Sequence, residues 1–213
     1  MLYDFGEIKN KKLKKKHYME AYSPKLDRIV ILNNELEYDN WVLLESDPGI
    51  VEYCEQPIKI KYHENGFTYV TKIDIWFKKK NNEVGFIKLD YDDAKSVRYN
   101  NEILLQKRWC RENGFSYMLL GRREITSNEM YLNNMKHLLS VITAYKDIVD
   151  TDIKAIEKLI EENNRISIGA IVDKLNPIPY TRIRAAVYRM IYNGSIKADV
   201  KIVPLGDKTN VWQ

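Results

Sequence analysis

Phe67-Thr-Tyr-Val-Thr-Lys-Ile-Asp-Ile-Trp-Phe77 is the segment around which the architecture of this chain is built. A polar run follows it, Lys78-Lys-Lys-Asn-Asn-Glu83, and then a second apolar piece, Val84-Gly-Phe-Ile-Lys-Leu-Asp-Tyr91. Both apolar pieces are rich in β-branched and aromatic residues, and the polar run is typical of a hairpin loop. We therefore expect two adjacent antiparallel strands.

The strand pattern brings charged side chains together. Because side chains alternate between the two faces of a strand, Lys88 and Asp90 project to one side, and a modest choice of hairpin register would place Asp74 beside them. Two carboxylates and one ammonium form the residue set of a metal-dependent phosphodiesterase, in which acidic oxygens hold a hard divalent cation. The alternative is a solvated strand face that carries a single ion pair.

Composition limits the class of protein. The chain has 213 residues with a net charge of +4, which allows a packed core and permits nucleic-acid binding without demanding it. No apolar run approaches the length of a membrane span, so we expect a cytoplasmic protein without membrane contact. Cys54 and Cys110 lack metal-ligand spacing and are expected to be reduced core thiols.

Residues 1–20 form a basic arm. Its lysines include four candidate DNA contacts, Lys12, Lys14, Lys15 and Lys16. Such an arm gains affinity for a polyphosphate through counterion release, and it equally suits a solubilising tail.

Further elements flank the central hairpin. We expect a helix that Asn33 or Asn34 can cap and that ends at Asp47-Pro-Gly, and one half-buried strand over residues 50–62 in which Pro57 favours an edge or a bulge. A second helix over 97–113 has Ile103, Leu104 and Trp109 on its apolar side, and a strand over 115–120 and a helix over 129–145 follow it. This order predicts an α/β core with a mixed sheet.

One long segment carries a family resemblance: Glu35-Leu-Glu-Tyr-Asp-Asn-Trp-Val-Leu-Leu-Glu-Ser-Asp-Pro-Gly-Ile-Val-Glu-Tyr-Cys-Glu-Gln-Pro57. With Gly114-Phe-Ser-Tyr-Met-Leu-Leu-Gly-Arg-Arg-Glu-Ile125, it resembles the TnsA family, the endonuclease subunit of heteromeric transposases. The resemblance covers most of residues 1–145. It implies a restriction-endonuclease-like mixed sheet flanked by helices, Mg²⁺-dependent cleavage of DNA phosphodiesters, and as partners an integrase-type transposase and an AAA+ regulator.

The resemblance also implies site residues. The family's helix glutamate falls on Glu37 and its strand aspartate on Asp74, and its "(Glu or Gln)-x-Lys" pair falls on Lys88 and Asp90 in exchanged order. Asp74 and Asp90 would then be the metal ligands, with Lys88 near the scissile phosphate.

Three interpretations of the exchange are open. In the first, a lysine at a ligand position repels the dication and the site is silent. In the second, the same four side chains still hold Mg²⁺, with Lys88 swung aside. In the third, Asp93-Ala-Lys95 is the motif, although it lies beyond the apolar strand and out of register.

Residues 149–213 resemble a winged helix. Helices are expected over 151–163, 169–175 and 180–192, with a short strand at 165–168 and two wing strands at 196–203 and 209–212. The third helix of such a domain enters the major groove, so Tyr180, Thr181, Arg182 and Arg184 are candidate DNA contacts, together with Lys197 of the wing. The alternative is a protein-contact domain whose arginines merely face solvent.

The sequence therefore predicts a basic arm (1–20), a TnsA-like nuclease-fold domain (21–148) and a winged-helix domain (149–213). The expected function is DNA processing, with Mg²⁺-dependent cleavage if the site is competent. The alternative is a catalytically silent DNA-binding or scaffold subunit with the same fold.

Overall fold

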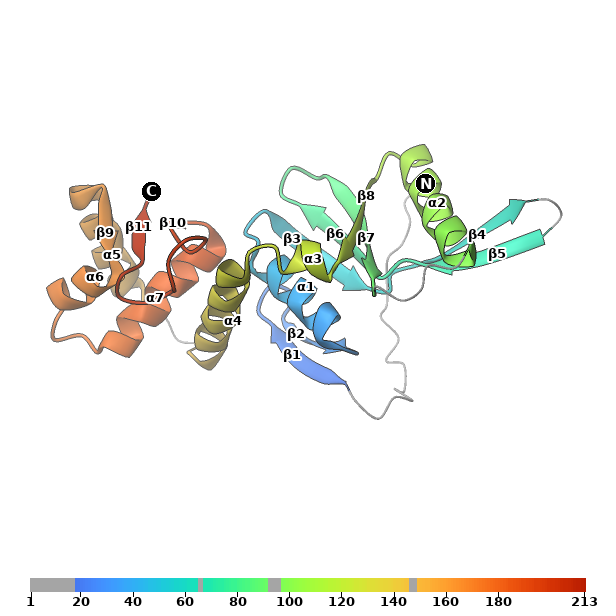
Figure 1. The fold of residues 1–213 in the computed structure, drawn as a ribbon. Coiled ribbons are helices and arrows are strands. Elements are labelled where there is room, and N and C mark those ends of the chain that lie inside the picture. Colours follow the sequence, from blue (N-terminus) through green and yellow to red (C-terminus); the bar gives the residue numbers. More distant parts are fainter. Residues whose placement is uncertain (1–17, 65–66, 92–96, 146–148) are drawn as a thin grey trace. The chain divides into compact units, whose positions relative to one another are not determined.

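The computed structural model describes residues 18–64, 67–91, 97–145 and 149–213 (Figure 1). The chain divides into two compact units. The N-terminal unit contains the chain up to Asn40 together with Gly49–Ile125, and the C-terminal unit contains Trp41–Pro48 and Thr126–Gln213. Helix α4 (Glu129–Ala144) thus belongs to the C-terminal unit, whereas the sequence placed it in the domain ending at residue 148.

A four-stranded mixed sheet forms the centre of the N-terminal unit. Its order is β3 (Ile50–Glu55), β6 (Ile75–Lys79), β7 (Val84–Asp90) and β8 (Ser116–Gly121). The first three strands are antiparallel, and β7 and β8 are parallel because helix α2 (Val97–Glu112) forms the crossover between them. The predicted α/β fold with a mixed sheet flanked by helices is confirmed, as is the hairpin of β6 and β7.

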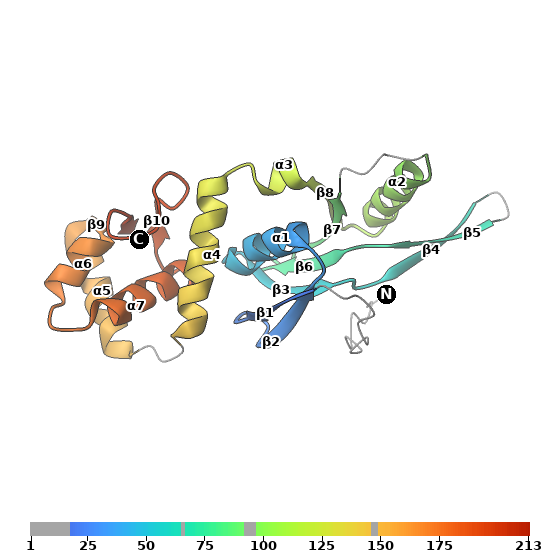
Figure 2. The same cartoon turned by 60° about the horizontal axis from the view of Figure 1, so that its bottom comes forward.

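The structure corrects two predicted long strands. Residues 67–77 form β5 (Phe67–Lys72) and β6, separated by Ile73 and Asp74, and residues 50–62 form β3 and β4 (Lys59–Glu64). Gln56 has a positive φ of 49°, and Pro57 lacks a backbone donor, so the chain leaves the main sheet there. Strands β4 and β5 instead pair with each other as a two-stranded ribbon, which extends beyond the main sheet in Figures 1 and 2.

The remaining elements of this unit surround its core. A hairpin of β1 (Met19–Ser23) and β2 (Arg28–Leu32) precedes helix α1 (Glu35–Ser46), and α3 (Arg122–Ile125) follows β8. Phe86 on β7 is fully buried and packs edge-on against Trp109 and Phe115, with ring centroids 5.5 and 5.3 Å apart. Cys54 and Cys110 are both free and buried, and burial raises the pKa of the Cys110 thiol to about 12.

The C-terminal unit is mainly helical. It contains α4, α5 (Asp150–Asn163), α6 (Ile168–Lys174) and α7 (Tyr180–Asn193), with strands β9 (Arg165–Ser167), β10 (Lys197–Ala198) and β11 (Asn210–Trp212). The strands form a small sheet in the order β10–β11–β9. The predicted strand 196–203 is much shorter, because residues 199–203 turn and Asp199 accepts hydrogen bonds through its carbonyl from the backbone of Ile202 and Val203.

Helix α1 is shared between the two units. Its residues up to Asn40 belong to the first unit, and Trp41 onward belongs to the second. Within the second unit, the buried Glu45 accepts a hydrogen bond of 2.6 Å from the hydroxyl of Tyr192 on α7. Among the described residues, no helix combines the length and apolar character needed to cross a membrane.

Candidate functional site

Asp74 and Lys88 form an ion pair at the end of the β6–β7 ladder. Lys88 Nζ lies 3.2 Å from Asp74 Oδ2, as the hairpin register predicts. The same oxygen accepts the backbone N–H of Leu89 at 2.8 Å, and the Asp74 carbonyl accepts the N–H of Gln56. The Lys88 and Asp74 side chains are only 13% and 24% exposed. Asp74 therefore extends the hydrogen bonding between the two strands by one position, just before β6 begins.

Burial governs the ionisation of Asp74. Loss of water around the carboxylate raises its pKa above the ordinary value of 3.8. The charge of Lys88 and the hydrogen bond from Leu89 oppose this shift without cancelling it, and the nearby charge of Glu37 adds to it. The ammonium thus compensates a carboxylate for which burial is costly.

Asp90 lies on the same face of β7 as Lys88. The face continues from Phe86 through Lys88 to Asp90, because residues two apart in a strand share a side. Asp90 is 8% exposed, and its Oδ1 accepts a hydrogen bond of 2.9 Å from the hydroxyl of Tyr99 on α2. Burial, and then this hydrogen bond, raise the pKa of Tyr99, so the phenol remains a donor to Asp90.

Glu37 caps the start of α1. Its Oε2 accepts the backbone N–H of Asn33 at 2.8 Å and the Asn33 side-chain amide at 2.9 Å. Its own backbone N–H donates to Asn34 Oδ1 at 3.0 Å, so the Asn34 side chain caps the helix. The hydroxyl of Tyr91 donates to the other carboxylate oxygen at 3.0 Å. The resemblance assigned Glu37 to catalysis, whereas in the structure its carboxylate binds Asn33 at the start of the helix and Tyr91 after β7.

The arrangement does not fit a Mg²⁺ ion. Mg²⁺ needs near-octahedral oxygen ligands at about 2.0–2.1 Å. Here an ammonium lies in hydrogen-bonding range of Asp74, Asp90 is bound by Tyr99, and Glu37 is bound by Asn33 and Tyr91. No group of three or more His, Cys, Asp or Glu side chains suited to a metal is found within the described ranges. We therefore assign no chemistry to a metal at this position.

A buried polar network lies beside this cluster and was not predicted. Gln106 of α2 is fully buried and donates to the hydroxyl of Thr71 at 2.6 Å and to the carbonyl of Lys72 at 3.0 Å. The hydroxyl of Tyr117 donates to its side-chain oxygen at 3.0 Å, and Thr71 also bonds to Glu102. These contacts fasten the inner face of the ribbon to α2. The signal in the sequence was Gln106, which lies three residues after Ile103 and three before Trp109, on the side of the helix expected to be apolar.

The candidate contacts on α7 are engaged within their own unit. Arg182 forms a two-bond ion pair with Asp152 of α5, a carboxylate that is 2% exposed. Arg184 lies 2.6 Å from Asp207 and over the ring of Tyr180. Tyr180 is exposed and Thr181 is half-buried, and Lys197 donates to the carbonyl of Gln213 at 3.2 Å. Each of the two arginines thus has a carboxylate partner, which lies 30 residues from Arg182 and 23 residues from Arg184 in the sequence.

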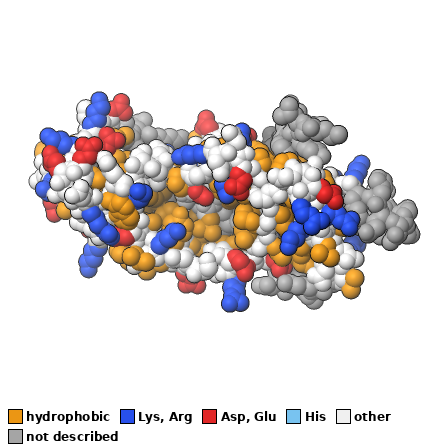
Figure 3. Space-filling view, turned by 90° about the horizontal axis from the view of Figure 1, so that it is seen from above, with side chains coloured by type: hydrophobic (Ala, Val, Ile, Leu, Met, Phe, Trp, Pro, Cys, Tyr) orange, Lys and Arg blue, Asp and Glu red, His pale blue; other side chains and the backbone are white. Residues whose placement is uncertain are grey.

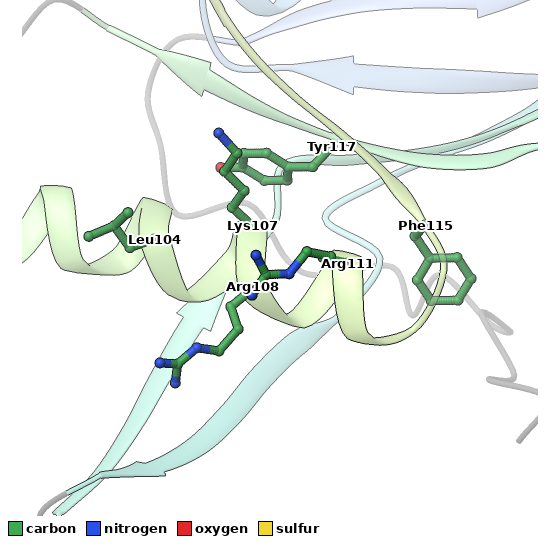
Figure 4. Close-up of a pocket in the computed structure, with 6 residues that line it drawn as sticks. All are labelled: Leu104, Lys107, Arg108, Arg111, Phe115 and Tyr117. Atoms are coloured by element: carbon green, nitrogen blue, oxygen red, sulfur yellow. The ribbon is translucent and has the colours of Figure 1, made fainter.

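A basic hollow on the outer side of α2 was also missed. It has a volume of about 640 Å³ and is lined by Leu104, Lys107, Arg108, Arg111, Phe115 and Tyr117. Leu104, expected on the apolar side of the helix, is 63% exposed, because Gln106 and Cys110 take the buried face. Figure 4 shows Lys107 alongside Tyr117, with Arg108 next to it on the helix and Arg111 one turn further along. Blue and orange side chains gather near α2 in Figure 3.

The three cations that line this hollow, Lys107, Arg108 and Arg111, form no ion pair with another residue of the described ranges. Like charges at spacings of three and four on a helix disfavour the helix slightly. Cations that share a hollow with aromatic side chains suit an anionic ligand that carries flat rings, as nucleic acids do.

Five other predicted residues or motifs lie outside the described residues. They are Lys12, Lys14, Lys15 and Lys16 of the basic arm, and the motif Asp93-Ala-Lys95. Comparison with known proteins gives no further constraint, since neither a protein-family model nor a curated protein sequence matches this chain.

Proposed function

We propose that this protein is a DNA-binding subunit of a DNA-processing complex, with a TnsA-like nuclease fold that does not itself cleave DNA. The observation that carries the proposal is the ion pair of Lys88 with Asp74, 3.2 Å long and largely buried. It lies where the resemblance would require a carboxylate to hold a metal.

The electrostatics of that pair argue against the active interpretation. A dication at Asp74 would have to displace an ammonium that offsets the burial of the carboxylate. Repulsion between the ammonium and a dication at contact distance is large at a site this poorly solvated. For Lys88 to swing aside, it would have to leave a position where it is 13% exposed and give up its ion pair.

Several features support DNA binding by the same fold. The mixed sheet with a parallel crossover agrees with the restriction-endonuclease-like architecture that the resemblance implies. The order α5, β9, α6, α7, β10, β11 supports a winged helix in the second unit. The cations on α2, which have no ion-pair partner among the described residues, offer contacts for phosphates. An integrase-type transposase and an AAA+ regulator are the partners proposed from the resemblance.

A cleavage and binding assay tests this proposal. The purified protein, incubated with supercoiled plasmid in Mg²⁺ or Mn²⁺, is expected to leave the plasmid intact. The same preparation is expected to retard a 30-base-pair duplex, with a dissociation constant of about 10⁻⁶ M at moderate salt that weakens as salt rises.

The controls are Asp74→Ala and Asp90→Ala proteins. Nicking by the wild type that both substitutions abolish would establish the enzyme with a rearranged site, and our proposal would be wrong. Absence of duplex binding would refute the DNA-binding part.

A further inference from the structure

The β4–β5 ribbon has one covered face and one open face. Ile60 and Thr71, which lie opposite each other, face α2: Ile60 packs in the core with Cys110, and Thr71 bonds to Gln106. The alternate residues Lys59, Lys61, Val70 and Lys72 are exposed on the other face. The register pairs Lys59 with Lys72, and Lys61 with Val70. The open face therefore carries three lysines around one exposed valine.

The lysines on the open face destabilise the pairing of β4 with β5. Like charges directly opposite on neighbouring strands destabilise the pairing. No carboxylate forms an ion pair with Lys59, Lys61 or Lys72 in the part of the chain that the structure describes. Val70 is 55% exposed between them, which leaves an apolar side chain in water. An anionic surface against this face would relieve the repulsion between the lysines, and an apolar group on that surface could cover Val70.

The dimensions of the ribbon suit duplex DNA. Two strands about 4.8 Å apart fit a major groove about 12 Å wide, which admits a two-stranded ribbon. Six residues in each strand reach about 20 Å along the groove. Lysines at the edges of the face can meet phosphates, and an exposed valine can contact a thymine methyl group. Figures 1 and 2 show the ribbon projecting past α2.

We propose that the open face of the β4–β5 ribbon, defined by Lys59, Lys61, Val70 and Lys72, binds the major groove of duplex DNA. This inference rests on the proposed DNA-binding function, and it assigns that function to a surface which the sequence analysis did not identify. The ribbon supplies positioning contacts to the phosphates, and the buried network of Gln106 holds its inner face in place.

The test compares two double variants of equal charge. Lys59→Gln with Lys72→Gln is expected to weaken binding of a 30-base-pair duplex about tenfold, and to reduce the slope of log affinity against log salt by about 2. Its melting temperature is expected to stay level or rise, because the opposed charges are gone. The control, Lys80→Gln with Arg123→Gln, removes two exposed cations elsewhere in the N-terminal unit and should leave the slope unchanged.

The outcomes distinguish a failure of the ribbon inference from a failure of the proposed DNA-binding function. If the wild type binds no duplex, the proposed function fails. If the wild type binds but the Lys59 and Lys72 variant keeps its affinity and slope, the ribbon inference alone fails. It also fails if Arg108→Gln with Arg111→Gln removes the salt dependence while the ribbon variant does not, since binding would then lie at the basic hollow. Equal loss in the control variant would reduce the effect to net charge and overturn the assignment.

Discussion

Replacing Lys88 by methionine is expected to lower the free energy of unfolding by about 3 kcal/mol at neutral pH. Methionine keeps the length and apolar contacts of the lysine stem but removes the ammonium, so Asp74 is left as a poorly solvated carboxylate without its cation. The hydrogen bond from the Leu89 N–H remains, which keeps the loss below that of a fully unpaired charge.

The effect of Lys88→Met should depend on pH. The folded pKa of Asp74 is raised above 3.8, so between that value and the folded pKa the native state binds more protons than the unfolded state. Stability therefore falls as pH rises through this window. Removing the ammonium raises the folded pKa further and widens the window, because the charge of Lys88 lowers it in the wild type. The difference between variant and wild type is thus expected to grow with pH and to shrink in acid.

Urea unfolding of both proteins at several pH values measures this difference. Lys79→Met is the matched control, since Lys79 pairs with Glu83 on the same hairpin, with both side chains more than a third exposed. Its loss should stay below about 0.5 kcal/mol. A Lys88→Met protein as stable as the wild type at neutral pH would show that Asp74 does not need its cation, and would weaken the argument for a silent site.

Replacing Asn134 by alanine is expected to lower the free energy of unfolding of the C-terminal unit by about 3 kcal/mol. Asn134 is 6% exposed on α4, and its amide donates to the carbonyls of Val200 and Val203 at 2.7 and 2.8 Å. Its side-chain oxygen accepts the N–H of Leu205 at 2.8 Å. The substitution leaves three backbone groups unsatisfied in the loop between β10 and β11.

Hydrogen exchange followed by mass spectrometry measures this loss by region. Amides of residues 199–212 should exchange faster in Asn134→Ala, while those of β6 and β7 should be unchanged. Asn163→Ala is the control, because Asn163 is exposed and makes one side-chain bond of 2.7 Å to the Leu159 carbonyl. Equal protection in the Asn134 variant and the wild type would contradict the assigned role of these hydrogen bonds.

The sequence predicted those features of the fold that follow from local pattern. The β-branched and aromatic run, the polar loop and the alternation of charges led to the β6–β7 hairpin and to the contact of Lys88 with Asp74. The ribbon was missed because alternation alone does not reveal that the strand pattern is interrupted at Gln56 and Asp74. Which partner a strand takes is decided by the whole sheet.

The site was predicted incompletely because several of its side chains bind residues that are distant in the sequence. The pattern of α7 identified Arg182 and Arg184 as polar residues in its first turns, but their carboxylate partners lie on α5 and in the loop before β11. Glu37 was placed in the correct helix, yet its bonds to Asn33 and Tyr91 became visible only in three dimensions. Charge type can be read from a sequence, whereas charge compensation requires the fold.

The division of α1 between the units bears on how a gene for such a protein can be rearranged. The C-terminal unit is encoded by two separate stretches, residues 41–48 and 126–213. A single crossover near codon 126 would transfer α4 to β11 but leave behind Glu45, the buried acceptor of the Tyr192 hydroxyl, and Pro48, which packs against Gly194. The unit can therefore be exchanged intact only together with the residues between its two parts, which favours inheritance of both units as one module.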